Sequence, residues 1–169
     1  MSFEIYKDKR VLLTGDTGFK GGWMKFWLEK LGAIVCGYSL PPATTPNHYE
    51  LLFGKAFPRG CDILDVAMLG KVVREFHPDI VFHLAANAVV AKTFEDPQGT
   101  FNVNVMGSVN VLEVCRQNPG IKGVVMIVTD KVYESREWNY AYFPVESRII
   151  SRRLAAAKFY SFCQRSRYE

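Results

Sequence analysis

Three evenly spaced glycines are the part of the sequence that most directly predicts chemistry. Gly15, Gly18 and Gly21 stand in the segment Thr14–Gly21, TGDTGFKG, between an apolar run and a segment with helical spacing. In this context the first glycine permits a tight turn, the second lets the backbone approach a pyrophosphate, and the third lets helix and strand pack closely. The helix N-terminus adds unpaired N–H groups and partial positive charge. The segment predicts a dinucleotide-binding turn; a glycine-rich turn without a ligand is the alternative.

The residue that usually selects between NAD and NADP is missing from its expected place. In dinucleotide-binding folds an acid about 20 residues beyond the turn, at the end of the second strand, bonds the ribose hydroxyl. Here that end reads Gly37–Pro41, GYSLP, with neither an acid nor an arginine. The pattern leaves the choice of cofactor open.

The alternation of apolar runs with helical segments predicts a single Rossmann domain, an α/β fold with a doubly wound parallel sheet. We expect at least five parallel strands. Gly32 should end the first helix and Asp65 should cap the second. The expected strands are Arg10–Thr14, Ile34–Tyr38, a weakly indicated one at Gly60–Ile63, Asp79–Leu84 and Gly123–Val128, and the expected helices are Gly18–Leu31, Val66–Phe76 and Pro97–Gln117.

Residues 1–133 are expected to form the NAD(P)-binding part, and residues 134–169 a divergent tail of the same domain. The tail ends in a predicted basic helix, Arg148–Arg167. Its arginines raise the possibility of nucleic-acid binding, but interleaved apolar residues favour packing or dimerisation. We therefore expect no nucleic-acid partner.

Composition is that of an ordinary globular protein. The net charge is +4, 49% of residues are hydrophobic and 22% are charged. No apolar run reaches the roughly 18 residues of a membrane helix, and the N-terminus is too charged for a signal peptide, so we expect a cytoplasmic protein without a membrane partner. The cysteines show no metal-binding spacing and are expected to be reduced packing residues, without a metal site: Cys36, Cys61, Cys115 and Cys163.

Seven motifs in order resemble the extended short-chain dehydrogenase/reductase family, and within it the sugar-nucleotide 4,6-dehydratases that act on CDP-glucose. The turn is similar to that branch's TGHTGFKG, with Asp16 in place of its histidine. The likeness covers about Lys9 to Trp138. The other matching segments are Gly37–Pro42 (GYxLPP), Asp62-Ile63, His83–Ala86 (HxAA), Asn104–Gly107 (NVMG), Thr129–Tyr133 (SDKCY) and Arg136–Trp138 (REW).

This resemblance implies a cofactor, NAD with NADP not excluded, and a nucleotide-sugar substrate. It implies that NAD takes a hydride from C4 of the sugar and leaves a ketone there. The ketone acidifies the C5 proton, water leaves from C6, and the hydride returns to C6. Thr129, Asp130 and Lys131 would then be the catalytic hydroxyl, acid and base. The cofactor would lie against Gly15, Thr17, Gly18, Phe19, Lys20, Gly21, Asp62, Ile63, Leu84, Ala85, Ala86 and Asn104.

Two departures from the family pattern argue against full activity. The family uses a tyrosine and a lysine four residues apart, yet no tyrosine in this sequence has a lysine four residues on; the two positions fall on Ile150 and Leu154. The family's substrate domain is also expected to be missing. The chain is therefore expected to be weakly active or inactive. The alternatives are a noncatalytic nucleotide-binding or interaction module and a truncated or frame-shifted remnant. A homodimer through the helices Pro97–Gln117 and Arg148–Arg167 is expected.

Overall fold

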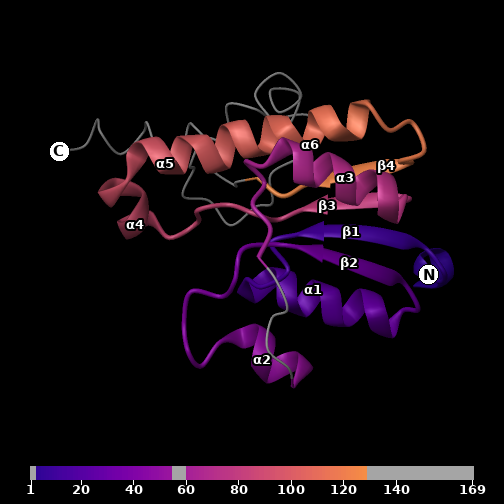
Figure 1. Ribbon diagram of the computed structural model, residues 1–169. Coiled ribbons are helices and arrows are strands. Elements are labelled where there is room, and N and C mark those ends of the chain that lie inside the picture. The colour runs from indigo at the N-terminus through magenta and orange to yellow at the C-terminus, as the bar shows by residue number, and fades with distance from the viewer. Residues whose placement is uncertain (1–2, 55–59, 129–169) are drawn as a thin grey trace, which may run out of the picture.

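A parallel sheet forms the centre of the computed structural model, which describes residues 3–54 and 60–128 (Figure 1). In the described part the sheet has four strands in the order β2-β1-β3-β4. They are β1 (Arg10–Thr14), β2 (Ile34–Tyr38), β3 (Ile80–His83) and β4 (Gly123–Met126). All pairings are parallel, and Thr14 lies beside both Tyr38 and His83. The carboxyl ends of three strands therefore meet at one edge, and the predicted Rossmann architecture is confirmed.

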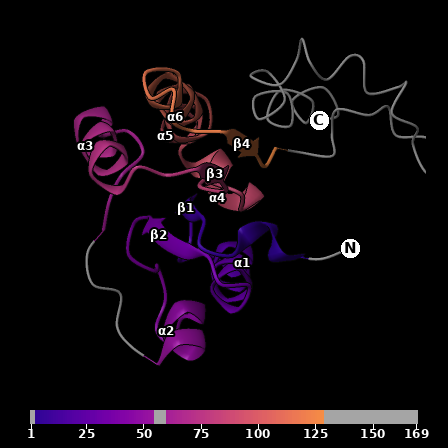
Figure 2. The same ribbon diagram turned by 90° about the vertical axis from the view of Figure 1, so that its right-hand side faces the viewer.

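Helices cover both faces of the sheet (Figure 2). On one side lie α1 (Phe19–Lys30) and α2 (His48–Phe53), and on the other α3 (Val66–Phe76) and α6 (Gly107–Arg116). Leu12 of β1 packs into a core with residues of α3 and α6, while Val11 and Leu13 pack with Leu28 of α1. Alternate residues of β1 thus enter two cores, which explains why the strand reads as one unbroken apolar run.

Local signals fix the ends of the predicted helices. Gly18 is the N-cap of α1, and Gly32 follows it with a φ of +83°, a left-handed conformation that glycine adopts without strain. The Asp65 carboxylate accepts a hydrogen bond from the Met68 N–H at 2.9 Å and caps α3. Both predicted helix signals are confirmed, and the strands at Asp79–Leu84 and Gly123–Val128 are present with slightly shorter bounds.

The predicted strand at Gly60–Ile63 is wrong. Among the described residues, one backbone hydrogen bond joins this segment to the sheet region, from the Cys61 N–H to the Ser39 carbonyl at 2.6 Å. The Asp62 side chain then accepts from the Leu64 N–H and starts a turn, so no ladder develops. The described sheet therefore has four strands where we expected at least five.

The segment after β2 and the long helix both differ from expectation. The proline-containing loop includes a helix that the sequence interpretation missed, α2, capped by Asn47 and ended by Gly54 with a φ of +62°. The predicted helix Pro97–Gln117 is present as α5 (Pro97–Phe101), the π-helical segment η2 (Asn102–Met106) and α6. Two further short helices are η1 (Phe3–Tyr6) and α4 (Val90–Glu95).

Several sequence expectations fall outside the described residues. They include the helix Arg148–Arg167, the tail as a whole and the three residues Thr129, Asp130 and Lys131. Among the residues that are described, no helix is both long and apolar enough to cross a membrane.

Candidate nucleotide-binding site

A pocket opens where the carboxyl ends of β1, β2 and β3 meet. Its walls come from the glycine-rich turn, from the residues after β2, from the segment around Asp62 and from the loop after β3. This is the place at which open α/β sheets bind ligands. The lining residues are Gly15, Thr17, Gly18, Tyr38, Ser39, Leu40, Cys61, Asp62, Ile63, Leu84, Ala85, Ala86, Asn87 and Val103.

Each of the three positions in the turn has a different structural reason to be glycine. Gly15 has a φ of +78°, and a Cβ atom there would lie 2.7 Å from the Ala85 nitrogen. A Cβ on Gly21 would lie 1.9 Å from the Gly15 carbonyl oxygen. At Gly18 a Cβ would meet only that same oxygen, at 3.3 Å. Packing therefore requires Gly15 and Gly21, whereas the missing side chain of Gly18 leaves open space in the pocket that Gly18 lines.

Most of the predicted cofactor residues come together in this pocket, and four do not line it. Phe19 and Lys20 are exposed on the first turn of α1, and Gly21 is buried beneath the turn. Asn104 is 9% exposed, and its side-chain amide is bonded to the backbone of Asn87. Lining residues that sequence reasoning missed are Tyr38, Ser39, Leu40, Cys61, Asn87 and Val103.

Tyr38 fixes the wall that contains Asp62. Its buried hydroxyl donates to the Asp62 carbonyl at 2.9 Å, and burial raises the pKa of Tyr38 well above its ordinary value. The phenol therefore stays a neutral donor. Asp62 in turn accepts from the Leu64 N–H at 2.9 Å through its carboxylate. Two hydrogen bonds thus hold the backbone and the side chain of Asp62 at the edge of the pocket.

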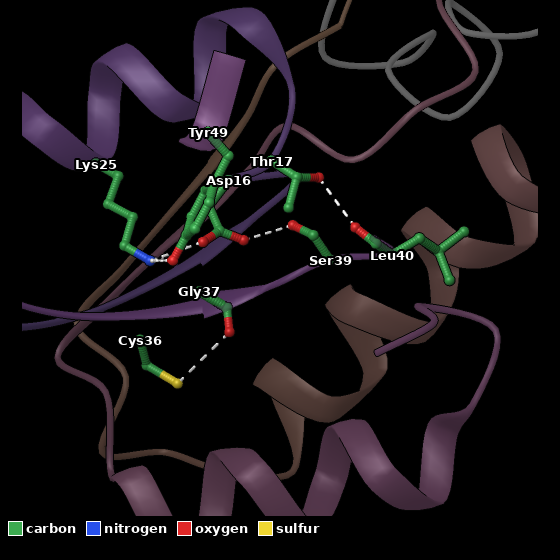
Figure 3. A network of polar contacts seen from close by, with 8 residues as sticks. All are labelled: Asp16, Thr17, Lys25, Cys36, Gly37, Ser39, Leu40 and Tyr49. Carbon is green, nitrogen blue, oxygen red and sulfur yellow. Dashed lines mark hydrogen bonds and ion pairs between the residues drawn. The ribbon is translucent and has the colours of Figure 1, made fainter. Parts of the chain in front are cut away.

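Asp16 joins the glycine turn to α1 and to the end of β2 (Figure 3). Its carboxylate is fully buried, accepts from the Ser39 hydroxyl at 2.5 Å and pairs with the Lys25 ammonium at 2.9 Å. A Cβ on Gly37 would overlap this carboxylate, so the glycine makes room for it. Next to it, the Thr17 hydroxyl donates to the Leu40 carbonyl at 3.0 Å. Two contacts therefore tie the turn to the end of β2.

Lys25 carries the charge that balances Asp16. Burial alone would lower the pKa of Lys25, but the hydrogen bond and the attraction from Asp16, with smaller contributions from Tyr49, raise this pKa on balance. The ammonium also lies 5.0 Å from the centre of the Tyr49 ring and 5.3 Å from that of Phe53. Both rings belong to α2, so Lys25 connects the turn to that helix through a cation–π contact.

Together the parallel sheet, the glycine turn at a helix N-terminus and the pocket define a dinucleotide-binding domain of Rossmann type. The model of the NAD dependent epimerase/dehydratase family matches residues 11–164. The chain belongs to this family, and the resemblance seen in the sequence is confirmed. NAD is the cofactor that the family's description names.

Similar proteins agree with this assignment. A CDP-glucose 4,6-dehydratase of Salmonella typhimurium is 43% identical over 140 residues, which are 82% of this chain and 39% of the relative. A GDP-mannose 4,6-dehydratase of Yersinia enterocolitica is 31% identical over 126 residues, 65% of this chain and 32% of that relative. The chain thus spans less than half the length of the curated relatives it matches.

Solved structures show the same fold. An epimerase of Methanothermobacter thermautotrophicus superposes with a TM-score of 0.70 and 28% identity over 86% of this chain and 42% of the other. A UDP-glucose 4-epimerase of Thermus thermophilus, in complex with NAD, gives a TM-score of 0.66 and 29% identity over 88% of this chain and 51% of the other.

The Asp16–Lys25 pair yields a prediction about stability. Lys25→Met leaves the buried Asp16 carboxylate without its counter-charge, and breaking a buried pair in this way costs about 3–5 kcal/mol. Asp16→Asn combined with Lys25→Met removes both charges, so this double variant should lose less stability than Lys25→Met alone. Urea unfolding measures both. Lys71→Met is the control, because its pair with Glu75 is exposed; it should change stability by less than about 0.5 kcal/mol. A double variant less stable than Lys25→Met would contradict this account of the pair.

Proposed function

We propose that the chain binds NAD in the pocket at the carboxyl ends of β1, β2 and β3. The pyrophosphate would lie over Gly15–Gly21 at the N-terminus of α1, and the adenine would lie beside Asp62 and Ile63. The observation that carries the proposal is Gly18. It lines the pocket, and nothing in its packing demands a glycine as strictly as the packing of Gly15 and Gly21 does. Space for a close backbone approach to a phosphate explains the residue.

The preference for NAD over NADP rests on membership of the family. The end of β2 carries neither an acid for the ribose hydroxyl nor an arginine for a ribose phosphate. Ser39, which stands at that end, directs its hydroxyl inward to Asp16. We therefore expect the ribose to contact mainly backbone groups around Ser39 and Leu40.

The reaction that we propose for the ancestor of this site is dehydration of a nucleotide sugar. CDP-glucose is the proposed substrate, because the 43% identical relative is a CDP-glucose 4,6-dehydratase. When bound, NAD supplies a hydride acceptor that later returns the hydride. In sequence, Thr129, Asp130 and Lys131 follow β4 after Ile127 and Val128. In this proposal Thr129 bonds the C4 oxygen, Asp130 protonates the leaving C6 oxygen and Lys131 takes the C5 proton.

Turnover by the chain itself is proposed to be weak or absent. Tyrosine with a lysine four residues later serves the family as the base for the C4 hydroxyl, and this sequence has no such pair. General base catalysis contributes on the order of 10²–10⁴-fold to a rate. The alternative function is a noncatalytic nucleotide-binding or interaction module, which the missing pair favours. A location in the cytoplasm stays a prediction.

The first prediction of this proposal is that NAD binds and that Gly18→Val abolishes binding. Valine at this position would fill the space needed by the pyrophosphate, while its backbone angles, φ −73° and ψ 167°, are ordinary for a β-branched residue. Isothermal titration calorimetry measures the affinity. Gly120→Val is the matched control, because a Cβ there meets nothing within 4 Å. Equal NAD binding by the wild type and by Gly18→Val would mean that the turn is only structural.

A second prediction concerns the dehydratase reaction. Incubated with CDP-glucose and NAD, the chain should form little or no 4-keto-6-deoxy sugar, since it lacks the proton-transfer pair. The product is measured by its absorbance in alkali. Robust turnover would refute the prediction and would show that another group, such as Tyr133 or Tyr142, moves the proton.

A third prediction is self-association through the helix that contains α6. Met106, Val109 and Leu112 are 44%, 43% and 45% exposed and recur every three residues on it, which leaves apolar surface that a second copy would bury. Sedimentation should show a homodimer that Val109→Glu with Leu112→Glu dissociates. A clean monomer of the wild type at high concentration would reject the proposal.

A further inference from the structure

His83, the last residue of β3, is a fully buried polar side chain that the proposed chemistry does not use. It lies between Thr14 at the end of β1 and Ser108 on α6. Its Nδ1 is 2.7 Å from the Thr14 hydroxyl oxygen, and its Nε2 is 3.0 Å from the Ser108 hydroxyl oxygen. The residue after it, Leu84, begins the wall of the pocket. A polar link therefore runs directly behind the proposed cofactor site.

The hydrogen bonds around Thr14 indicate which nitrogen of the His83 imidazole carries the proton. The Thr14 hydroxyl oxygen accepts from the backbone N–H groups of Leu84 and Ala85, each at 3.2 Å. The Leu84 N–H is shared with the Thr14 carbonyl oxygen, at 3.1 Å, but both N–H groups approach the hydroxyl oxygen, which leaves Nδ1 of His83 as the neighbour that accepts its hydrogen. Nδ1 must then be an acceptor. From this geometry we infer a neutral His83 ring with its proton on Nε2.

The hydrogen bonds from Thr14 through His83 form a relay, which continues into the long helix Pro97–Gln117. With its proton on Nε2, His83 donates to Ser108, and the Ser108 hydroxyl donates to the Asn104 carbonyl at 2.7 Å. Asn104 lies in the π-helical segment η2, and such segments are frequent at functional sites. With this tautomer, each hydrogen bond named here from Thr14 to Asn104 has a donor and an acceptor.

Asn104 connects these hydrogen bonds to the wall of the pocket. Its side-chain oxygen accepts from the Asn87 N–H at 2.8 Å, and its side-chain nitrogen donates to the Asn87 carbonyl at 3.0 Å. Asn87 lies in the irregular segment between β3 and α4, where no strand neighbour pairs with its backbone. One end of the wall Leu84–Asn87 is thus held by Thr14 and the other by Asn104.

We propose that His83 is a positioning residue for the cofactor pocket. As the Nε2-protonated tautomer it couples Thr14 to Ser108 and Asn104, and this relay fixes the wall Leu84–Asn87 relative to the glycine turn. The proposal rests on the proposed function, because the pocket it positions is the proposed NAD site. Packing alone does not explain the relay, since an apolar side chain would fill the same space without burying polar groups. A satisfied buried polar network instead specifies one arrangement of the groups it joins.

The tautomer gives a test that does not involve NAD. In nitrogen NMR spectra of the full chain, the imidazole nitrogen without a proton resonates far downfield of the protonated one, and long-range couplings to the ring protons identify each. The signals of His83 are assigned by their loss in His83→Asn. We expect a neutral ring with the proton on Nε2. A ring protonated on Nδ1 or on both nitrogens would overturn the relay.

The second test measures the wall and the cofactor together. Ser108→Ala keeps the packing but breaks the relay, so it should weaken NAD binding roughly five- to thirtyfold and speed hydrogen exchange at the Asn87 amide. His83→Asn keeps an acceptor for Thr14 and loses the contact with Ser108, so adding Ser108→Ala to it should weaken binding by less than about twofold more. Lys71→Ala, with a side chain 62% exposed on α3, is the control and should change neither quantity.

The outcomes separate this proposal from the proposed function. If the wild type does not bind NAD, the proposed function fails, and the tautomer and the exchange at Asn87 still decide whether the relay holds the wall. If the wild type binds NAD but Ser108→Ala changes neither the affinity nor the exchange, the relay is overturned. Full additivity of His83→Asn and Ser108→Ala would also overturn it. Affinities are compared at a temperature at which every variant is fully folded, so that a loss of stability alone does not mimic the effect.

Discussion

The turn between β1 and α1 passes through a space in which neither Gly15 nor Gly21 could carry a Cβ atom. At Gly15 the obstacle is the backbone of Leu84 and Ala85 at the end of β3, and at Gly21 it is the backbone of the turn itself. Backbone atoms cannot move aside as the end of a flexible side chain can. The distances between β1, β3 and α1 are therefore set by this close approach, and the pocket exists because the strand ends meet there.

Two buried polar networks hold the turn from opposite sides. On the α1 side, Asp16 joins the turn to Lys25 and Ser39. On the α6 side, Thr14 joins the start of the turn to the loop after β3 and, through His83, to Ser108. Buried polar groups are costly unless their partners are in place, so each network disfavours other arrangements of the elements it connects. Both serve one result, which is a backbone cradle that is formed before any ligand arrives.

The sequence predicted the parts of the fold that local signals encode. The apolar runs of β1 and β3, the cap at Asp65 and the glycine after α1 each appear within a few residues of the element they define. The strand predicted at Gly60–Ile63 is wrong because Ile63 is apolar for a different reason. Its side chain packs into the core with residues of α3 and α6, and its backbone does not pair in the sheet. The α2 helix was not predicted because the three prolines before it indicate a loop, although Asn47 and Gly54 cap the helix.

Only those residues of the candidate site that belong to a sequence motif could be predicted. The turn, Asp62, Ile63 and the segment Leu84–Ala86 come from motifs, and the structure brings them into one pocket. Asn104 was expected at the cofactor, yet its amide is bonded to Asn87, a partner that no local pattern specifies. Asp16 is similar: a carboxylate in a turn is usually solvated, and only the fold brings Lys25 and Ser39 to it. Contacts between distant segments decide these roles.

A titration of the isotope-labelled chain with NAD, followed by amide chemical shifts, tests the central claim most directly. If the cofactor lies where the strand ends meet, the shifts should change at Gly15–Gly18, at Ser39 and Leu40, at Asp62 and Ile63, and at Leu84–Asn87. The exposed aromatic face of α1, with Trp23 and Trp27, should stay unchanged beyond its first turn. Saturable changes that centre on another surface, or none at millimolar NAD, would contradict the account.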